Sequence, residues 1–430
     1  MKIYLTILLF FLYSFAYAQN PSLPSGGETP ASLSCIYGLT PYVPGCSINS
    51  ASIVPQTGSG IIAVIDGGDD PDAYGELTQF SQQFHLNGLP QCTLPPNPPN
   101  PPCFQTYYAA TCQAASSPGA GSPPPAVTIN EPEIDIEWAH AMAPFASIYI
   151  IETNGWGITP MMSAVQCANS LLAQTGGTIS FSDSFPESQL GPTEISYDSN
   201  FQTPGILYFM SSGDYQAPAR YPATSPYVIA AGGTSIRRDS LGNYIDQVAW
   251  HNTKMVCDLD EPCKNGVSGG PSAYEPRPSY QNSVQKIVGT KRGTPDISFV
   301  AENVDVFCCS FAADTTNQQC CVRPGTSPNP NKPSLTACQT VSTTTCASGY
   351  GTWVVTGGTS LAAPALAGIV NSAHSGAKSS AEELTNIYNG AVKNYHEYWT
   401  DITVGNNGYP ALQGYDFTTG LGVPRGYSGK

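Results

Sequence analysis

The sequence of 430 residues is short of charged side chains, and basic ones are the scarcest. Charged residues make up 11% of the chain, with 16 Lys and Arg against 31 Asp and Glu and a formal net charge of −15. An average soluble protein has about 25% charged residues. A chain without a basic surface is a poor partner for nucleic acid or an anionic membrane. Carboxylates lose their charge at about pH 4, so this composition is compatible with work in acid.

Metal-binding and glycosylation motifs are also missing. The 14 cysteines include no C-x-x-C pair, and no His lies among the six that crowd into residues 308–346. The cysteines are therefore predicted to form disulfides in an oxidising compartment rather than to bind zinc. The close pairs that suggest local loops are Cys35 with Cys46, Cys92 with Cys103, and Cys257 with Cys263. No Asn-x-Ser/Thr sequon occurs, so N-glycosylation is not expected.

Long apolar runs are absent apart from the stretch from Ile3 to Phe15. This run follows a positively charged start and precedes Ala16-Tyr17-Ala18, a small-x-small cleavage pattern. It is shorter than the roughly 20 residues of a membrane span and has the flanks of a secretory signal peptide. Residues 1–18 are therefore predicted to be a signal peptide. The location is expected to be extracellular, with an acidic vacuolar or lysosomal compartment as the alternative, and no membrane association is expected after signal removal.

Apolar strand-like segments alternate with candidate helices over most of the chain. Strands are expected at 61–65, 147–151, 178–181, 206–210 and 227–230, and helices at 131–145, 159–173 and 361–375. Continuous apolar strands with helical crossovers predict an α/β fold with a parallel sheet covered on both faces. Functional groups in such folds lie at the carboxyl ends of the strands. No segment resembles a linker between domains, so one domain with decorated loops is expected.

The segment NEPEIDIEWAHAM, residues 130–142, predicts a helix with Asn130 as its N-cap. One face is expected to carry Glu131 and Asp135 together with the apolar Trp138, Met142 and Phe145. The other face is expected to point outward, with Glu133, Glu137 and His140. Carboxylates on a buried face are costly unless they are paired or used. The alternative is that acids simply favour a helix N-terminus, which accounts for Glu133 better than for Asp135.

Two further segments place polar side chains at the ends of predicted strands. In TGGTSLAAP, residues 356–364, Ser360 follows a strand and a Gly-Gly turn and stands at the start of a helix of small residues. Such a Ser is either a nucleophile with room for a substrate backbone or an ordinary N-cap. In SSGD, residues 211–214, Asp214 follows the strand at 206–210. It is either a functional carboxyl group or an ordinary turn residue.

Together these segments resemble the sedolisin family of serine-carboxyl peptidases, which are acid endopeptidases and tripeptidyl peptidases with a subtilisin-like fold. The motifs are GGTSLAAP around Ser360, Glu131-x-x-x-Asp135 followed by AHAMAP, and SSGD followed by YPATSPYVIAAGGTS. Further matches are SGGPSAYEPRPSYQ, RGTPDIS and the ending GYDFTTGLGVP. The resemblance implies a three-layer fold with a mostly parallel central sheet and disulfide-decorated loops.

The family's catalytic roles carry over to four positions. The resemblance implies that Ser360 is the nucleophile, Glu131 the general base, Asp135 its orienting partner and Asp214 the oxyanion stabiliser. It also implies one structural Ca²⁺ ion near the C-terminus. That ion would be bound by side chains and backbone oxygens of Asp401, Ile402, Leu412, Gly414 and Asp416. The implied function is acid-acting hydrolysis of protein or peptide substrates by a secreted enzyme, expected to be a monomer.

Three features differ from the usual pattern of the family. Residues 19–31 are expected to form only a short N-terminal segment without a long propeptide, followed by a catalytic domain at 32–430. A Cys-rich insertion is expected at about 306–349. Where some relatives extend the carboxylate pair with Glu and Trp, this chain has Asp66 and Asp183.

Three other interpretations compete with this one. A subtilisin-like triad would use Asp66 and Ser360, but no His-Gly-Thr segment supplies its base. A hydrolase with Ser268 as nucleophile fits G-x-S-x-G at 266–270, although that segment follows a polar loop instead of a buried strand. The third is a non-catalytic secreted binding protein on a peptidase scaffold. The presence of all four catalytic residue types argues against it.

Overall fold

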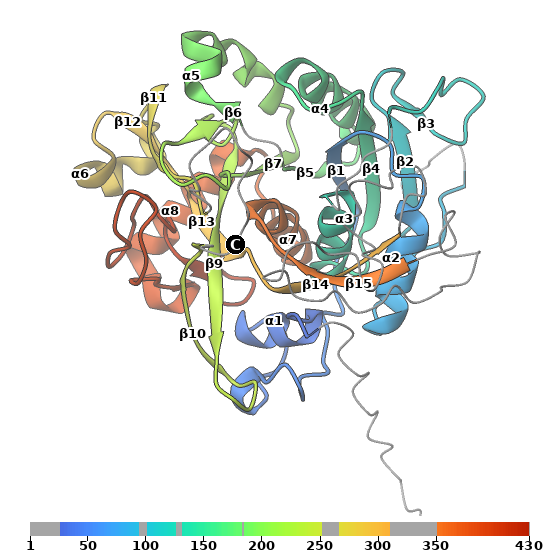
Figure 1. Cartoon of the computed structure of the whole chain (residues 1–430). Coiled ribbons are helices and arrows are strands. Elements are labelled where there is room, and N and C mark those ends of the chain that lie inside the picture. Colours follow the sequence, from blue (N-terminus) through green and yellow to red (C-terminus); the bar gives the residue numbers. More distant parts are fainter. Residues whose placement is uncertain are drawn as a thin grey trace, which may run out of the picture.

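The computed structural model of the chain (Figure 1) describes residues 26–93, 101–125, 131–182, 185–251, 266–309 and 351–429. The predicted signal peptide, Asn130, Asp183, the Cys257–Cys263 pair and most of the Cys-rich insertion lie outside these residues. Across the described ranges, none of the helices has both the length and the apolar character needed to cross a membrane.

The centre of the structure is a sheet that has nine strands within the described residues. Its order is β10-β9-β7-β5-β1-β4-β2-β3, and β13 also pairs with β9. The strands are β1 Ile61–Gly67, β2 Phe104–Tyr108, β3 Gln113–Ala114, β4 Ser147–Thr153, β5 Gly177–Phe181, β7 Ile206–Ser211, β9 Ile229–Arg238, β10 Tyr244–Ala249 and β13 Ile297–Val300. All pairs are parallel except β9–β10 and β2–β3. The predicted mostly parallel sheet is confirmed. Four of the five predicted strands lie in it over their whole length, and the fifth, predicted at 227–230, begins only at Ile229 and continues to Arg238.

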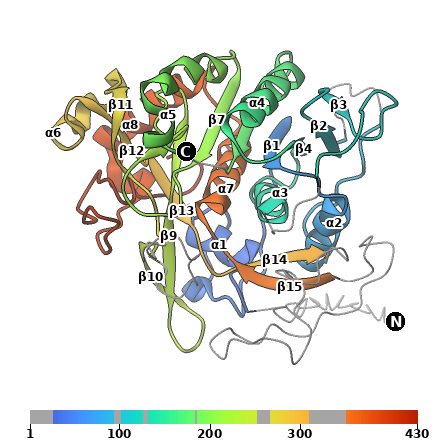
Figure 2. The ribbon, with the colours of Figure 1, turned by 45° about the horizontal axis from the view of Figure 1, so that its top comes forward.

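Helices cover both faces of this sheet, which gives three layers (Figure 2). The helices are α1 Pro30–Ile36, α2 Ala73–Gln83, α3 Glu131–Met142, α4 Ile158–Leu172, α5 Glu187–Leu190, α6 Gln285–Val288, α7 Thr359–Ser372 and α8 Ser380–Tyr398. Ile62 and Val64 of β1 share a core with α2, α3 and α7. The alternate residues Ile61 and Ala63 share a second core with α4. Because both faces are buried, β1 is apolar throughout instead of alternating.

Several short elements complete the described structure. The 3-10 helices are η1 Pro44–Cys46, η2 Gly191–Phe201 and η3 Ser279–Val284. The remaining strands form two-stranded ribbons: β6 Phe185–Pro186 with β8 Arg220–Tyr221, β11 Gly270–Pro276 with β12 Lys291–Thr294, β14 Val304–Cys309 with β15 Gly351–Thr356, and β16 Trp399–Thr400 with β17 Val423–Pro424. The strand expected before Ser360 is therefore β15, which lies in a ribbon outside the central sheet.

The helices α3 and α7 lie side by side (Figures 1 and 2), and the order of their contacts shows that they run in the same direction. Gly368 of α7 permits this close approach, since a Cβ there would lie 2.8 Å from the Ala139 carbonyl oxygen and 2.8 Å from the Met142 Cβ. One turn further along, the Ser372 hydroxyl donates to the Met142 carbonyl oxygen at 2.9 Å. This register brings the first turns of the two helices to the same edge of the molecule.

The prediction that one face of α3 points outward is wrong. Glu133, Glu137 and His140 are all fully buried. The reason is that α3 is enclosed on every side, by β1 and β4 of the sheet and by α2, α7 and β14. Phe145, which was expected on the buried face, lies beyond the end of the helix and is 39% exposed. The helix is therefore a central element that carries several buried carboxyl groups.

Disulfides stabilise the loops around the sheet. Two of the three suggested local pairs lie in the described residues, and both are formed: Cys35–Cys46 and Cys92–Cys103. A third bond, Cys112–Cys167, joins the β2–β3 turn to α4 across 55 residues. Its cysteines are far apart in sequence, so spacing alone did not pair them.

Candidate active site

Ser360 lies in the first turn of α7, close to the carboxyl edge of the central sheet. The helix begins at Thr359, and its N-cap is Gly358, which has no side chain to offer. Ser360 is therefore not the N-cap, and the ordinary explanation for a Ser at this place does not apply. Its side chain faces the space beside Gly358: a Cβ on that glycine would lie 3.4 Å from Ser360 Oγ and 2.9 Å from Asp214 Oδ2. Glycine at 358 thus keeps open the space between these two polar groups.

Asp214 follows β7 and is held against the start of α7. Its Oδ1 accepts hydrogen bonds from the Thr359 backbone amide at 2.8 Å and from the Thr359 hydroxyl at 2.6 Å. The Thr359 hydroxyl in turn accepts the Gly213 amide at 3.0 Å. Thr359 therefore positions Asp214, a role that sequence reasoning missed although Thr359 stands directly before Ser360 in the GGTS segment.

The surroundings of Asp214 favour its neutral form more than water does. Burial raises the pKa of the Asp214 carboxyl above its usual value. The two bonds from Thr359 and the positive charge of Arg220 lower the pKa and offset part of this increase. A carboxyl group that keeps its proton can donate a hydrogen bond, which a carboxylate cannot.

Glu131 and Asp135 lie one turn apart at the start of α3. Glu131 is the first residue of the helix and partly exposed, whereas Asp135 is fully buried. Asp135 Oδ2 accepts a hydrogen bond from the Ser182 hydroxyl, and the Ser182 carbonyl accepts one from Ser211. Ser182 follows β5, so Asp135 is tied to the carboxyl edge of the sheet. This contact was also missed in the sequence, where nothing marks Ser182.

Asp135 is one of several carboxyl groups that share a buried environment. Burial raises the pKa of Asp135 well above its usual range, the negative charges of Asp66 and Glu131 add to this increase, and the Ser182 bond lowers it. Asp66 ends β1 and is 1% exposed. Asp66 thus lies close enough to Asp135 for their charges to interact, while Asp183 lies outside the described residues.

The predicted catalytic residues fall into two pairs that the fold brings to one edge. Asp214 and Ser360 flank Gly358, and Glu131 and Asp135 begin the helix that runs beside α7. The parallel register through Gly368 places the first turn of α3 beside the first turn of α7.

The alternative nucleophile Ser268 lies in a different setting. It is fully buried, and its hydroxyl accepts the Tyr215 amide at 3.1 Å. Its own amide donates to the Gly213 carbonyl at 2.7 Å, and the Gly266 amide donates to the Asp214 carbonyl at 2.9 Å. This segment therefore supports the turn that carries Asp214, and it does not present an exposed hydroxyl on a strand-to-helix turn.

Four of the five predicted calcium ligands are linked in pairs by hydrogen bonds near the C-terminus. Asp401 accepts the Gly414 amide at 3.1 Å through Oδ2, and Asp416 accepts the Leu412 amide at 2.8 Å. Burial raises the pKa of Asp416 to about 6, although the amides of Leu412, Thr419 and Thr418 lower it. Two carboxylates fixed around a loop with backbone carbonyls fit a hard cation. The side chain of Leu412 is 52% exposed, so its size does not interfere with a backbone ligand.

Three curated proteins are similar to this chain in sequence. No family model matches the chain. Sedolisin from Pseudomonas sp. (strain 101) is 29% identical over 208 residues, which are 48% of this chain and 28% of the relative. Kumamolisin from Bacillus sp. (strain MN-32) is 27% identical over 325 residues, which are 69% of this chain and 49% of the relative. Xanthomonalisin from Xanthomonas sp. (strain T-22) is 27% identical over 210 residues, which are 47% of this chain and 20% of the relative. The chain thus spans less than half the length of each of these relatives.

A solved structure shows the same fold over nearly the whole chain. Pseudomonas sedolisin, a serine-carboxyl proteinase solved with two molecules of pseudo-iodotyrostatin, superposes with a TM-score of 0.62 at 22% identity, over 93% of this chain and 96% of that one. The fold is therefore the α/β fold of a serine-carboxyl proteinase. With the three relatives above, it confirms the resemblance of this chain to the sedolisin family.

Proposed function

We propose that this chain is a secreted serine-carboxyl peptidase that hydrolyses peptide bonds in acid, with Ser360 as nucleophile. The observation that carries the proposal is that Ser360 Oγ and Asp214 Oδ2 both border the space beside Gly358. A nucleophile needs an oxyanion stabiliser close to the same substrate carbonyl, and the position of both groups beside Gly358 supports these two roles. The relatives named above support the same class of activity.

The first half of the reaction forms an acyl-enzyme. Ser360 Oγ attacks the substrate carbonyl carbon while its proton passes to the Glu131 carboxylate. The tetrahedral oxyanion accepts a hydrogen bond from protonated Asp214. When the C–N bond breaks, Glu131 returns the proton to the leaving amine. Asp135 orients Glu131 and shares its proton, so the two carboxyl groups titrate as a pair.

The second half releases the acid product and restores the enzyme. Water attacks the ester carbon, and Glu131 takes a proton from it. The C–O bond to Ser360 then breaks, and the serine oxygen recovers the proton from Glu131. In each half of the reaction Glu131 first accepts a proton from the attacking oxygen and then returns it, while Asp214 donates a hydrogen bond to the oxyanion. The reaction therefore needs an ionised base pair and a protonated Asp214 at once, a condition that an acidic medium supplies.

We propose that one Ca²⁺ ion stabilises the C-terminal loop, bound by Asp401 and Asp416 with backbone oxygens of Ile402, Leu412 and Gly414. The ion would supply charge balance for the buried Asp416 and would connect β16 to the loop at 412–416. It takes no part in bond breaking.

A peptide-library digestion tests the proposed activity. The secreted chain, purified after removal of residues 1–18, is incubated with mixed peptides between pH 2.5 and 7.5, and the products are sequenced by mass spectrometry. Cleavage with an optimum below pH 6 and its loss in Ser360→Ala are expected. Products of three residues from free N-termini would indicate tripeptidyl cleavage, and internal cuts would indicate an endopeptidase. No cleavage at any pH by the folded chain would favour a binding protein instead.

A further inference from the structure

Three buried carboxyl groups outside the proposed catalytic set meet between α2 and α3. Asp70 lies between β1 and α2, while Glu76 and Glu133 belong to the first turns of α2 and α3. They are 3%, 0% and 0% exposed. One oxygen from each lies within 4.8 Å of the oxygens of the other two. Two oxygens that each bind Ca²⁺ at about 2.4 Å can be at most about 4.8 Å apart, so the spacing matches a shared ion.

Two of these carboxyl groups are each fixed by a backbone amide through one oxygen. Asp70 Oδ1 accepts the Asp72 amide at 3.0 Å, and Glu76 Oε1 accepts the Cys309 amide at 2.5 Å. Within the described residues, Asp70 Oδ2 and Glu76 Oε2 accept no hydrogen bond from a donor group. The backbone amides therefore hold both side chains in place and leave the second oxygen of each available to a ligand.

Glu133 provides a separate observation from the other helix. Among the described residues, neither of its carboxylate oxygens has a hydrogen-bond partner, although the side chain is fully buried. Buried acceptors without partners are rare and costly in native proteins. Because one Glu133 oxygen lies within 4.8 Å of both Asp70 and Glu76 oxygens, an ion among the three would satisfy it.

The charge of the cluster must be balanced by protons or by a cation. The ion pairs found in the described part of the chain join Arg237 to Asp246, Arg238 to Glu28 and Arg292 to Asp296, and none reaches this cluster. Burial raises the pKa of Glu76 and Glu133 well above their usual range and that of Asp70 to about 6. The Asp70 and Glu76 carboxyls are close enough to share a proton, whereas Glu133 interacts with Asp70 through charge. A shared proton can thus link Asp70 to Glu76, whereas a bound cation can be coordinated by all three carboxylates.

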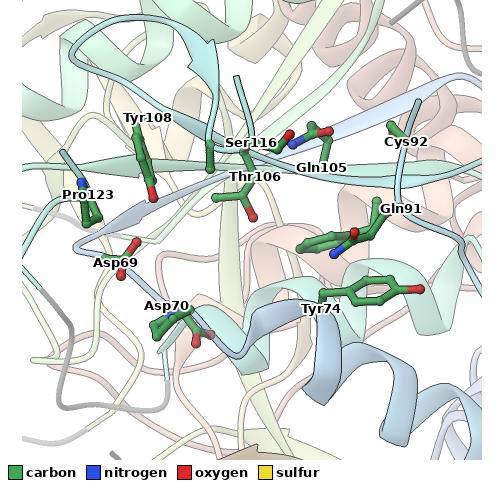
Figure 3. Close-up of a pocket in the computed structure, with 13 residues that line it drawn as sticks. Asp69, Asp70, Tyr74, Gln91, Cys92, Gln105, Thr106, Tyr108, Ser116 and Pro123 are labelled. Carbon is green, nitrogen blue, oxygen red and sulfur yellow. Dashed lines mark hydrogen bonds between the residues drawn. The ribbon is translucent and has the colours of Figure 1, made fainter. Parts of the chain in front are cut away.

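Space for a hydrated ion adjoins the cluster. Asp70 lines a cavity of about 430 Å³ between the start of α2 and β2 (Figure 3). Asp69, Gln105 and Tyr108 form other parts of its wall. The cavity therefore offers oxygen ligands and room for water beside one of the three carboxylates.

We propose that Asp70, Glu76 and Glu133 bind one divalent cation of the hard, oxygen-preferring kind, with Ca²⁺ favoured over Mg²⁺. Three carboxylates suit Ca²⁺, which takes several protein oxygens in flexible geometry, whereas Mg²⁺ usually keeps several of its waters and is bound by one or two carboxylates. The ion would link α2 to the first turn of α3, next to Glu131 and Asp135 in the sequence. It is distinct from the C-terminal site. The inference concerns binding and stability, so it does not depend on peptidase activity.

Calcium binding to the metal-free full secreted chain tests the proposal. Titration calorimetry and thermal unfolding at pH 7, where protons compete least, are run on Asp416→Asn, which lacks the C-terminal site. We expect one Ca²⁺ to bind and to raise the unfolding temperature. Adding Glu133→Gln to this background should weaken binding at least about 10-fold, because a carboxylate ligand is lost. Glu137→Gln is the matched control, a buried Glu one turn along the same helix, and should leave binding unchanged.

Two outcomes would overturn the proposal. One is that Asp416→Asn binds no Ca²⁺, which would leave protons to balance the cluster. The other is that Glu133→Gln in that background binds as tightly as its parent, which would place the ion elsewhere. If the Glu133 variant does not fold, wild-type crystals soaked in TbCl₃ decide the matter. An anomalous peak among the three carboxylates supports the site, and its absence rejects it.

Discussion

Thr359 donates two hydrogen bonds to the same oxygen of Asp214, one from its backbone amide and one from its hydroxyl. Two donors on Oδ1 keep that oxygen an acceptor, so the proton of a neutral Asp214 must lie on Oδ2. Oδ2 is also the oxygen nearest the space beside Gly358, which Ser360 Oγ shares. Thr359 therefore determines which oxygen of a neutral Asp214 carries the proton.

Replacing Thr359 by Val should alter the pH dependence of activity as well as its rate. Val keeps the size of the side chain but removes the hydroxyl that lowers the pKa of Asp214. The alkaline limb of the kcat profile should move to higher pH, and kcat should fall about 10-fold as Asp214 loses its orientation. Thr359→Ser restores the hydroxyl and should behave like wild type. An unchanged alkaline limb in Thr359→Val would contradict the positioning role.

Two substitutions of Asp214 should distinguish the need for a hydrogen-bond donor from the need for a titratable proton. Burial raises the pKa of this carboxyl, and a neutral acid loses its proton as pH rises, so activity should fall through that raised value. Asp214→Ala should lose about 10²–10³ in kcat, as for one oxyanion donor. Asp214→Asn keeps a donor that does not titrate, so it should retain more activity and shift the alkaline limb upward. A wild-type optimum at pH 7 or above would show that the site works differently.

Ser360→Ala should abolish peptide hydrolysis and leave the fold intact. The loss should reach about 10⁴-fold or more, because removal of a nucleophile disables the whole catalytic unit. Unchanged circular dichroism and unfolding temperature would show that folding is unaffected. Ser268→Ala is the comparison, and it should keep most of the activity. The opposite result, with Ser268→Ala inactive and Ser360→Ala active, would support the alternative hydrolase.

His140 should make the fold less stable as the medium becomes more acidic. Burial lowers the pKa of this fully buried imidazole to about 4, whereas an unfolded His titrates near 6.5. Between these values the unfolded chain binds a proton that the folded chain does not. Stability from this group is therefore complete above pH 6.5 and decreases towards pH 4. Between pH 6.5 and pH 4 the unfolding free energy of wild type should therefore decrease by about 3 kcal/mol more than that of His140→Gln. Urea unfolding at several pH values measures this, and parallel curves would reject it.

Removal of calcium should lower the unfolding temperature of wild type. An ion present at about 100 times its Kd adds about 2.7 kcal/mol to the folded state. Calorimetry at pH 5.5 with and without a chelator measures the shift, which should be smaller in Asp416→Asn than in wild type. Asp239→Asn is the control, because Asp239 also accepts loop amides but is exposed. Equal shifts in all three proteins would contradict a C-terminal site.

The sheet could be predicted from the sequence because its strands are apolar over their whole length. Ile61 to Ile65 and Ile206 to Met210 are continuous apolar runs, and only a sheet buried on both faces needs such strands. The candidate residues could be selected from the sequence because Asp214 follows a predicted strand, while Glu131 and Ser360 stand at the start of predicted helices. Their local setting is therefore encoded within a few neighbouring residues.

What the sequence did not reveal depends on contacts between distant segments. His140 and Glu133 are polar, and a helical projection assigns polar residues to solvent. Only the packing of α3 among α2, α7 and β14 buries them. Ser182 and Asp70 likewise acquire their partners from elements far away in the chain. Periodicity describes one helix at a time and contains no information about how many neighbours surround it.

The β14–β15 ribbon has a practical consequence for protein engineering. Cys309 and Gly351 are paired at its open end, while its other end leads from Thr356 through two glycines to Ser360. The two ends of the intervening 41-residue segment, 310–350, are thus anchored at neighbouring points that do not depend on the segment's length. Any engineered exchange of this segment therefore has to keep the pairing of the ribbon and the disulfide bonds of Cys308 and Cys309, because both cysteines lie at the end of β14 that faces the exchange.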